Sequence, residues 1–138
     1  SLGNLFVIQN AGNVSDTSVL GSIQYAIQHL KTPLIIVLGH TCCGAVTAAH
    51  QNKKMKGPLK DLITQIDENL VLNGNVEDSI KNHTLATARS LNAALEKHQA
   101  KIEQDARVIP AVYDITSGYI SWMDLEEDII ATPYLFSQ

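Results

Sequence analysis

The sequence predicts an α/β fold with a mainly parallel β-sheet flanked by helices. Leu34–Leu38 is an apolar run without alternation, which is typical of a strand covered on both faces. The chain alternates strand, helix, strand, helices and strand, the order that builds parallel sheets with helices on both faces. With 138 residues, 45% of them hydrophobic, residues 1–138 are expected to form a single domain.

The first predicted unit is a strand followed by a helix. Leu5–Gln9 is a short apolar run that ends at the breaker segment Asn10–Asn13, so we expect a buried strand. Asp16 suits the N-cap of the next helix, and Lys31–Pro33 ends it. The apolar residues of this helix repeat at helical spacing: Val19, Leu20, Ile23, Ile27 and Leu30.

The middle of the chain is expected to be mostly helical. After the strand Leu34–Leu38 come a tight loop, Gly39–Gly44, and a short helix that starts within Ala45–His50. Pro58 suits the first position of another helix, whose apolar residues are Leu59, Leu62, Ile63, Ile66 and Leu70. A longer helix follows, with one stripe formed by Ile80, Thr84, Ala88, Leu91 and Leu95.

The last predicted elements are a strand pair and a tail. Arg107–Tyr113 is expected to be a strand, at an edge or a bulge because Pro110 lacks a backbone N–H. Tyr119–Met123 should return antiparallel to it, and Asp124–Ile130 should form one more short helix. The ligands of such sheets collect beyond the carboxyl ends of strands, here at Asn10–Asn13 and Gly39–Gly44.

Composition excludes several classes of function. The net charge of −4, without a block of like charges, argues against nucleic-acid binding. The longest apolar run is far shorter than the roughly 18 residues needed to cross a bilayer, so no membrane insertion is expected. Cys42 and Cys43 are adjacent and cannot form a disulfide framework. These features predict a cytoplasmic domain, and the start at Ser1 suggests that the protein begins further upstream.

His40 and Cys43 are the candidate metal ligands. They lie three positions apart on a loop that leaves a strand, so both side chains can converge on one ion. Zinc accepts nitrogen and sulfur ligands in a tetrahedral shell. Two other interpretations remain open: a buried cysteine beside a core histidine, and a Cys-His nucleophile pair. The other histidines, His29, His50, His83 and His98, have no ligand-like spacing, and His83 is expected to be buried with satisfied hydrogen bonds.

Three blocks resemble the β-class carbonic anhydrases. Gly39, His40, Cys43, Gly44 and Ala45 match the family motif GHxxCGA after an apolar strand. Residues 5–13 resemble the segment FVxRNAGN, and residues 112–118 resemble the late Y-D-x-x-x-G turn. The resemblance therefore covers the chain from Leu5 to about Met123.

The resemblance implies a zinc site made by His40, Cys43 and a further cysteine. That cysteine belongs to a C-x-D-x-R motif on the first strand of the family, which lies between the strands at Leu5 and Leu34. The motif and its catalytic Asp-Arg pair are absent here, so the fold is expected to lack that strand and the domain to be N-terminally truncated. The resemblance places these residues at the substrate pocket: Asn10, Ala11, Gly12, Gly44, Ala45 and Tyr113.

Two positions weaken the match. Gln9 replaces the usual arginine, which removes a charge and puts a bicarbonate contact there in question. Cys42 is a poor substitute for the missing ligand, because adjacent side chains tend to point apart, and we expect it to pack as a small apolar residue.

The implied function is zinc-dependent reversible hydration of CO2 to bicarbonate, and this chain alone is expected to be inactive because zinc would bind it weakly or not at all. The alternative is a catalytically inactive binding or regulatory domain of the same fold, as part of a larger protein such as an anion transporter. A third hypothesis is a Cys-His hydrolase, for which no residue orienting His40 is evident. The resemblance also implies a homodimer or a higher homo-oligomer.

Overall fold

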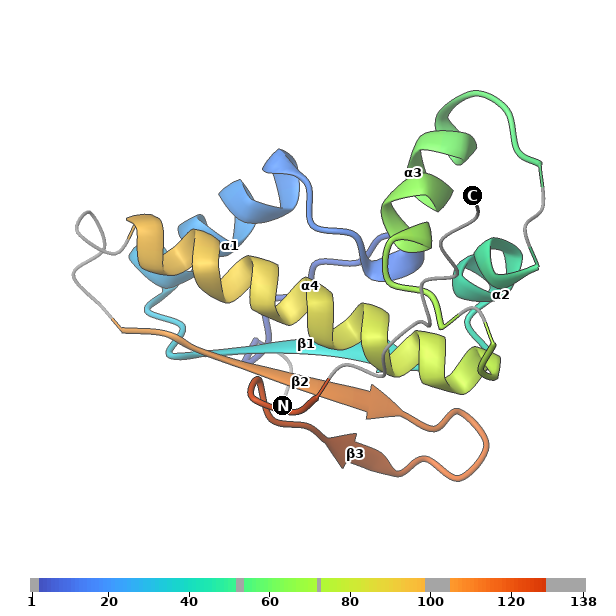
Figure 1. The fold of residues 1–138 in the computed structure, drawn as a ribbon. Coiled ribbons are helices and arrows are strands. Elements are labelled where there is room, and N and C mark those ends of the chain that lie inside the picture. The colour runs from blue at the N-terminus through green and yellow to red at the C-terminus, as the bar shows by residue number, and fades with distance from the viewer. Residues whose placement is uncertain (1–2, 52–53, 72, 99–104, 129–138) are drawn as a thin grey trace.

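A computed structural model describes residues 3–51, 54–71, 73–98 and 105–128, and in them a three-stranded sheet with the order β1-β2-β3. β1 (Leu34–His40) pairs in parallel with β2 (Arg107–Tyr113), and β3 (Ile120–Trp122) returns antiparallel to β2 (Figure 1). The predicted α/β class with parallel pairing is therefore confirmed.

The described helices are α1 (Thr17–Leu30), α2 (Gly44–His50), α3 (Pro58–Asp67) and α4 (Val76–His98), and a 3-10 turn, η1, covers Ala11–Asn13. The predicted cap of α1 is confirmed, since the carboxylate of Asp16 accepts a hydrogen bond from the Val19 amide at 2.9 Å. Lys31 ends α1 in the left-handed conformation. No helix of the described residues is long and apolar enough to cross a membrane.

α4 lies along one face of the sheet and packs on β1 and β2 (Figure 1). Val37 and Val108 point from this face into a buried cluster with α1 and α4, whose other buried members are Ile23, Ile27, Ala88, Leu91 and Leu95. On the opposite face of β1, the alternate residues Leu34, Ile36 and Leu38 stay 42–43% exposed. The expectation of helices on both faces is therefore wrong for β1 in the described chain, since one side of this strand is open.

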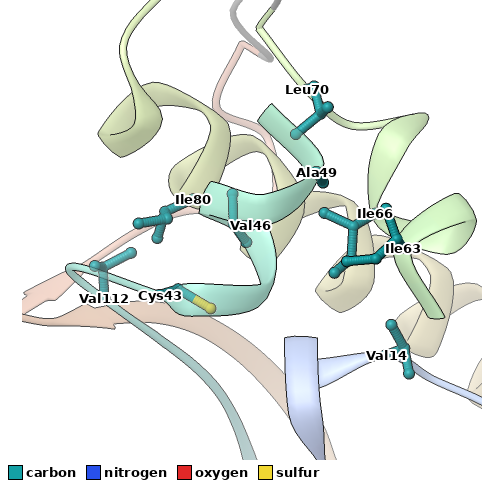
Figure 2. Close-up of a cluster of buried hydrophobic side chains, with 9 residues drawn as sticks. All are labelled: Val14, Cys43, Val46, Ala49, Ile63, Ile66, Leu70, Ile80 and Val112. Atoms are coloured by element: carbon teal, nitrogen blue, oxygen red, sulfur yellow. The ribbon is translucent and has the colours of Figure 1, made fainter. Parts of the chain in front are cut away.

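A second buried cluster fills the carboxyl end of the sheet. It joins Val14, Cys43 and Val112 to apolar residues of α2, α3, the connection after α3 and the first turns of α4: Val46, Ala49, Ile63, Ile66, Leu70 and Ile80 (Figure 2). This cluster packs α2 and α3 beside the end of β1. Because α4 contributes to both clusters, it connects the two ends of the sheet.

Leu5–Gln9 does not form the predicted strand. The segment has no strand assignment, and only Ile8 of these residues is even half-buried. β1 pairs with β2 alone among the described strands, so its outer edge has no strand partner there, and Leu5–Gln9 does not supply one. An apolar run predicts a strand only when a neighbouring edge is within hydrogen-bonding distance, and here a groove lies between them.

Two predictions near the C-terminus are also wrong. β2 is the central strand, although Pro110 predicted an edge or a bulge. The Pro110 carbonyl accepts from the Met123 amide at 3.0 Å, so the missing N–H of Pro110 faces the β3 side just past the last pair, Ala111 with Trp122. Asp124–Asp128 forms turns instead of a helix, and Ile129–Ile130 lies outside the described residues.

Candidate functional site

His40 is the last residue of β1, and its side chain is exposed. Its Nδ1 lies 2.9 Å from the carbonyl oxygen of Thr41. Because a carbonyl only accepts, Nδ1 carries a proton and donates. This bond fixes the ring, and in the neutral ring it leaves the lone pair of Nε2 available to a metal, as in metal sites that hold a histidine through its other nitrogen.

The two cysteines differ sharply in position. Cys43 caps the N-terminus of α2 and is 8% exposed, within the cluster of Figure 2. Cys42 has a φ of 57° and is exposed, so the expectation that it packs as an apolar residue is wrong. The left-handed backbone at Cys42 reverses the chain and directs its side chain outward, while Cys43 turns inward.

A groove of about 830 Å³ brings the predicted site residues together. His40, Cys43, Asn10, Gly12 and Tyr113 line it, whereas Ala11, Gly44 and Ala45 do not. Much of the remaining lining is apolar and comes from residues 5–8, from α1 and from β1. The groove therefore follows the open edge of β1 and ends at the His40–Cys43 loop.

Thr41 fixes this loop on the end of β2. Its amide donates to the carbonyl of Tyr113 at 2.9 Å, and its hydroxyl accepts from the Ile115 amide at 3.1 Å. His40 also pairs with Tyr113 in the β1–β2 register. Sequence reasoning missed Thr41, since a threonine between two candidate ligands carries no distinctive pattern.

The second predicted loop, Asn10–Asn13, lies against the same strand end. The side-chain amide of Asn13 donates to the Leu38 carbonyl at 3.4 Å, and that of Asn10 donates to the Val14 carbonyl at 2.8 Å. Gly12 is buried with a φ of 70°, a conformation that favours glycine. The two loops at which the sequence predicts ligands therefore lie close together, at the carboxyl end of β1.

The donor atoms of His40 and Cys43 suit zinc in kind but not in number. A catalytic zinc site uses three protein ligands and one open position. Within the described ranges, no group of three or more His, Cys, Asp or Glu side chains could hold a metal ion. In the described chain, the candidate metal ligands are therefore limited to the pair His40 and Cys43.

Comparison with known proteins identifies the family of this chain. Residues 1–120 match the family model described as carbonic anhydrase. The chain belongs to the carbonic anhydrase family. A carbonic anhydrase of Candida albicans is 32% identical over 91% of this chain and 50% of its own length. One from Mycolicibacterium smegmatis is 43% identical over 51% of this chain and 36% of its own length.

Structural comparison shows the same fold in the β class. The crystal structure of the β-carbonic anhydrase CafA from Aspergillus fumigatus superposes with a TM-score of 0.73 at 24% identity, over 93% of this chain and 67% of that one. The chain spans half or less of the length of these two curated relatives. The carbonic anhydrase fold assigned from the three sequence blocks is thus confirmed.

Proposed function

We propose that this chain carries part of a zinc site for the reversible hydration of CO2 to bicarbonate. The observation that carries the proposal is that His40 and Cys43 line the same largely apolar groove, in a chain of the carbonic anhydrase family. A catalytic zinc ion supplies hydroxide at neutral pH, because it lowers the pKa of the water that it binds to about 7.

The residues of this chain have distinct proposed roles. His40 presents Nε2 while Thr41 fixes its ring, and Cys43 presents sulfur from the start of α2. The apolar lining of the groove suits CO2, which is small and uncharged. Asn10, Gly12 and Tyr113 shape the wall near the ligands, and we place Ala11, Gly44 and Ala45 in their support.

We propose that the third ligand comes from a strand bound along the open edge of β1. That edge has no partner strand among the described residues, and the groove follows it to His40. A C-x-D-x-R sequence on this strand would add the missing cysteine and the Asp-Arg pair. The 138 residues by themselves should then bind zinc weakly and show negligible hydration of CO2.

Stopped-flow CO2 hydration with zinc present tests this proposal on two proteins. One is the 138-residue chain, and the other is the same chain extended at its N-terminus by a C-x-D-x-R strand. We expect activity only in the extended protein, and its loss in the His40→Ala and Cys43→Ala variants. Strong zinc-dependent activity of the short chain would contradict the two-ligand argument.

The second candidate is a binding or regulatory domain of the same fold. The incomplete ligand set in the described part of the chain favours it. An extended protein that carries the third cysteine, binds zinc and still lacks activity would support this candidate over the enzyme.

We also propose that the chain is one domain of a cytoplasmic homo-oligomer. α4 is shared by both buried clusters, which argues against a division into two domains. Cys42 and Cys43 are free thiols, as in proteins of reducing compartments. The exposed apolar face of β1 and β3 supports association with a second copy, which is tested below.

A further inference from the structure

His83 is a buried histidine that the proposed zinc site does not use. It lies on α4, is 4% exposed and borders the groove. Its Nε2 lies 2.5 Å from the carbonyl oxygen of Gly12, and its Nδ1 lies 3.2 Å from the side-chain nitrogen of Asn69. The imidazole therefore joins three separate parts of the chain: η1, the segment just after α3, and α4.

These partners define the protonation state of the ring. The Gly12 carbonyl can only accept, so Nε2 must carry the hydrogen and donate. With the amide nitrogen of Asn69 donating, Nδ1 must offer its lone pair. The network is satisfied by one form of His83, the neutral Nε2–H tautomer.

The bond to Gly12 acts on the turn beside the candidate ligands. Gly12 and Asn13 both have positive φ, at 70° and 50°. The Asn13 side chain reaches the Leu38 carbonyl, two residues before His40. Left-handed backbone is sparsely populated outside glycine and persists where its surroundings fix it, and the hydrogen bond from His83 is a polar contact from α4 that does so.

We propose that His83 is a positioning residue: its neutral imidazole holds the Ala11–Asn13 turn against β1 through the hydrogen bond to the Gly12 carbonyl, and protonation of the ring breaks this bond. We call this hydrogen bond the clasp. The importance of the turn for CO2 hydration rests on the proposed function. The clasp itself does not, so its test uses the structure of the turn and not enzymatic activity.

Two opposing effects act on the charged form. Burial disfavours the imidazolium and lowers the pKa of His83 below its usual 6.5, and this effect exceeds that of the Gly12 hydrogen bond, which raises the pKa. A protonated Nδ1 would also face the Asn69 amide donor. Turning that amide over would remove its contact with the Gln65 carbonyl, at 3.5 Å. The charged ring is thus better solvated outside the clasp.

The neighbouring elements offer His83 little compensating charge. Ala11–Asn13 contains no ionisable side chain. The ionisable residues on the segments around His83 and in the groove beside it are His40, Cys43, His50, Asp67, Glu68, Glu77, Asp78, Lys81 and Tyr113. Cys43 is buried, and His50, Asp78 and Tyr113 are half-buried, with His50 directed at the Ser79 hydroxyl at 3.2 Å; the other five are exposed. The ring nitrogens of His83 have neutral partners in Gly12 and Asn69.

Nuclear magnetic resonance of the 138-residue chain tests the clasp. At pH 8, the ring nitrogen shifts of His83 should report the Nε2–H tautomer. As the pH falls from 8 to 5, the protection factor of the Asn13 amide, which bonds to the Asn10 carbonyl, should fall at least about tenfold. The pH midpoint of this fall in protection should coincide with the titration midpoint of the His83 ring, and both should lie below pH 6.5.

Two variants separate positioning from simple packing. In His83→Gln the carboxamide can still donate to Gly12 but does not titrate, so the turn should stay protected at every pH. In Asn69→Asp a carboxylate faces Nδ1 and can accept from the protonated ring, so the titration midpoint of the His83 ring should rise and the turn should stay protected when the ring is charged. In the parent chain, an Nδ1–H tautomer or an Asn13 amide that ignores the His83 titration would overturn the proposal, as would an unchanged pH response in His83→Gln.

Discussion

At Gly39, β1 and α4 approach each other closely. A Cβ atom added there would overlap the hydroxyl of Thr84 on α4, whose own hydrogen bond to the Ile80 carbonyl holds it in place. We expect Gly39→Ala to lower the free energy of unfolding by about 1–3 kcal/mol, the usual cost of overpacking. Urea denaturation measures this loss.

Gly44→Ala is the matched control for that substitution. A Cβ atom at Gly44 meets no atom within 4 Å, and the residue begins α2. Since alanine favours helices over glycine by about 1 kcal/mol, this variant should be as stable as the parent or slightly more so. Equal losses in Gly39→Ala and Gly44→Ala would contradict the steric explanation.

Cys42 and Cys43 should differ in their effect on zinc. Cys43 lines the groove beside His40, whereas Cys42 is exposed on the turn. We expect Cys43→Ala to abolish whatever zinc binding the chain has and Cys42→Ala to leave it within about twofold, because one side chain contributes a ligand and the other does not. Competition with a chromogenic chelator measures both. A comparable loss in the two variants would show that the wrong cysteine has been assigned.

At the scale of elements, the turn between β2 and β3 depends on one carboxylate. Asp114 accepts from the amides of Thr116 and Ser117 at 2.8 and 3.1 Å. The Ser117 amide, followed by that of Thr116, holds the pKa of Asp114 below its usual 3.8. The carboxylate thus stabilises the turn above pH 3.8, and this stabilisation is lost as the pH falls through the lower pKa of the folded state.

Substitution of Asp114 separates the hydrogen bonds from the charge. Asp114→Asn keeps an acceptor oxygen, so the Thr116 and Ser117 amides should remain protected and lose their dependence on acidic pH. Asp114→Ala should expose both amides throughout the pH range. Hydrogen exchange from pH 2 to 6 measures these effects. If the pH response persists in Asp114→Asn, a group other than Asp114 is responsible for it.

Elements with a periodic or unbroken apolar pattern could be predicted from the sequence, and those that depend on a neighbour could not. The spacing in α1 and the run in β1 each indicate burial directly. Leu5–Gln9 has the same composition as a strand, but a strand also requires a partner edge. Pro110 is tolerated in β2 because β3 stops one residue earlier, which no local pattern reveals.

The candidate site shows the same division. His40 and Cys43 could be found because ligand types at ligand spacing follow a strand. Thr41 and His83 act through hydrogen bonds to residues 74 and 71 positions away, Ile115 and Gly12. Such contacts exist only after folding. The exposure of Cys42 could not be predicted, because a left-handed backbone, not hydrophobicity, decides which way its side chain points.

At the scale of the whole molecule, apolar side chains remain exposed along the sheet. Besides Leu34, Ile36 and Leu38 on β1, the β3 region exposes Tyr119, Ile120 and Trp122. We expect a homodimer at micromolar concentration by light scattering, because a surface of this kind favours association. A monomer at that concentration would contradict the expectation.

The β3 surface can be tested separately. Trp122→Ser should weaken the dimer at least about tenfold, since aromatic residues dominate the energetics of most interfaces. Leu59→Ser on α3 is the control, because Leu59 is similarly exposed but lies on another element. If the two variants dimerise equally well, the interface does not include the β3 surface.

The pairing of β1 with β2 also sets how this chain must fold. Each residue of β1 finds its partner 73 positions further along the chain, so the sheet forms by closing a very long loop. The entropy of closure grows slowly with length, by about 0.6 kcal/mol per doubling, so changes of loop length should alter the folding rate little. α4, by contrast, orders 23 residues of the connection. Ala93→Gly, at an exposed position of α4, weakens this helix. The variant should therefore slow folding more than it speeds unfolding, since we expect α4 to form before β1 and β2 pair.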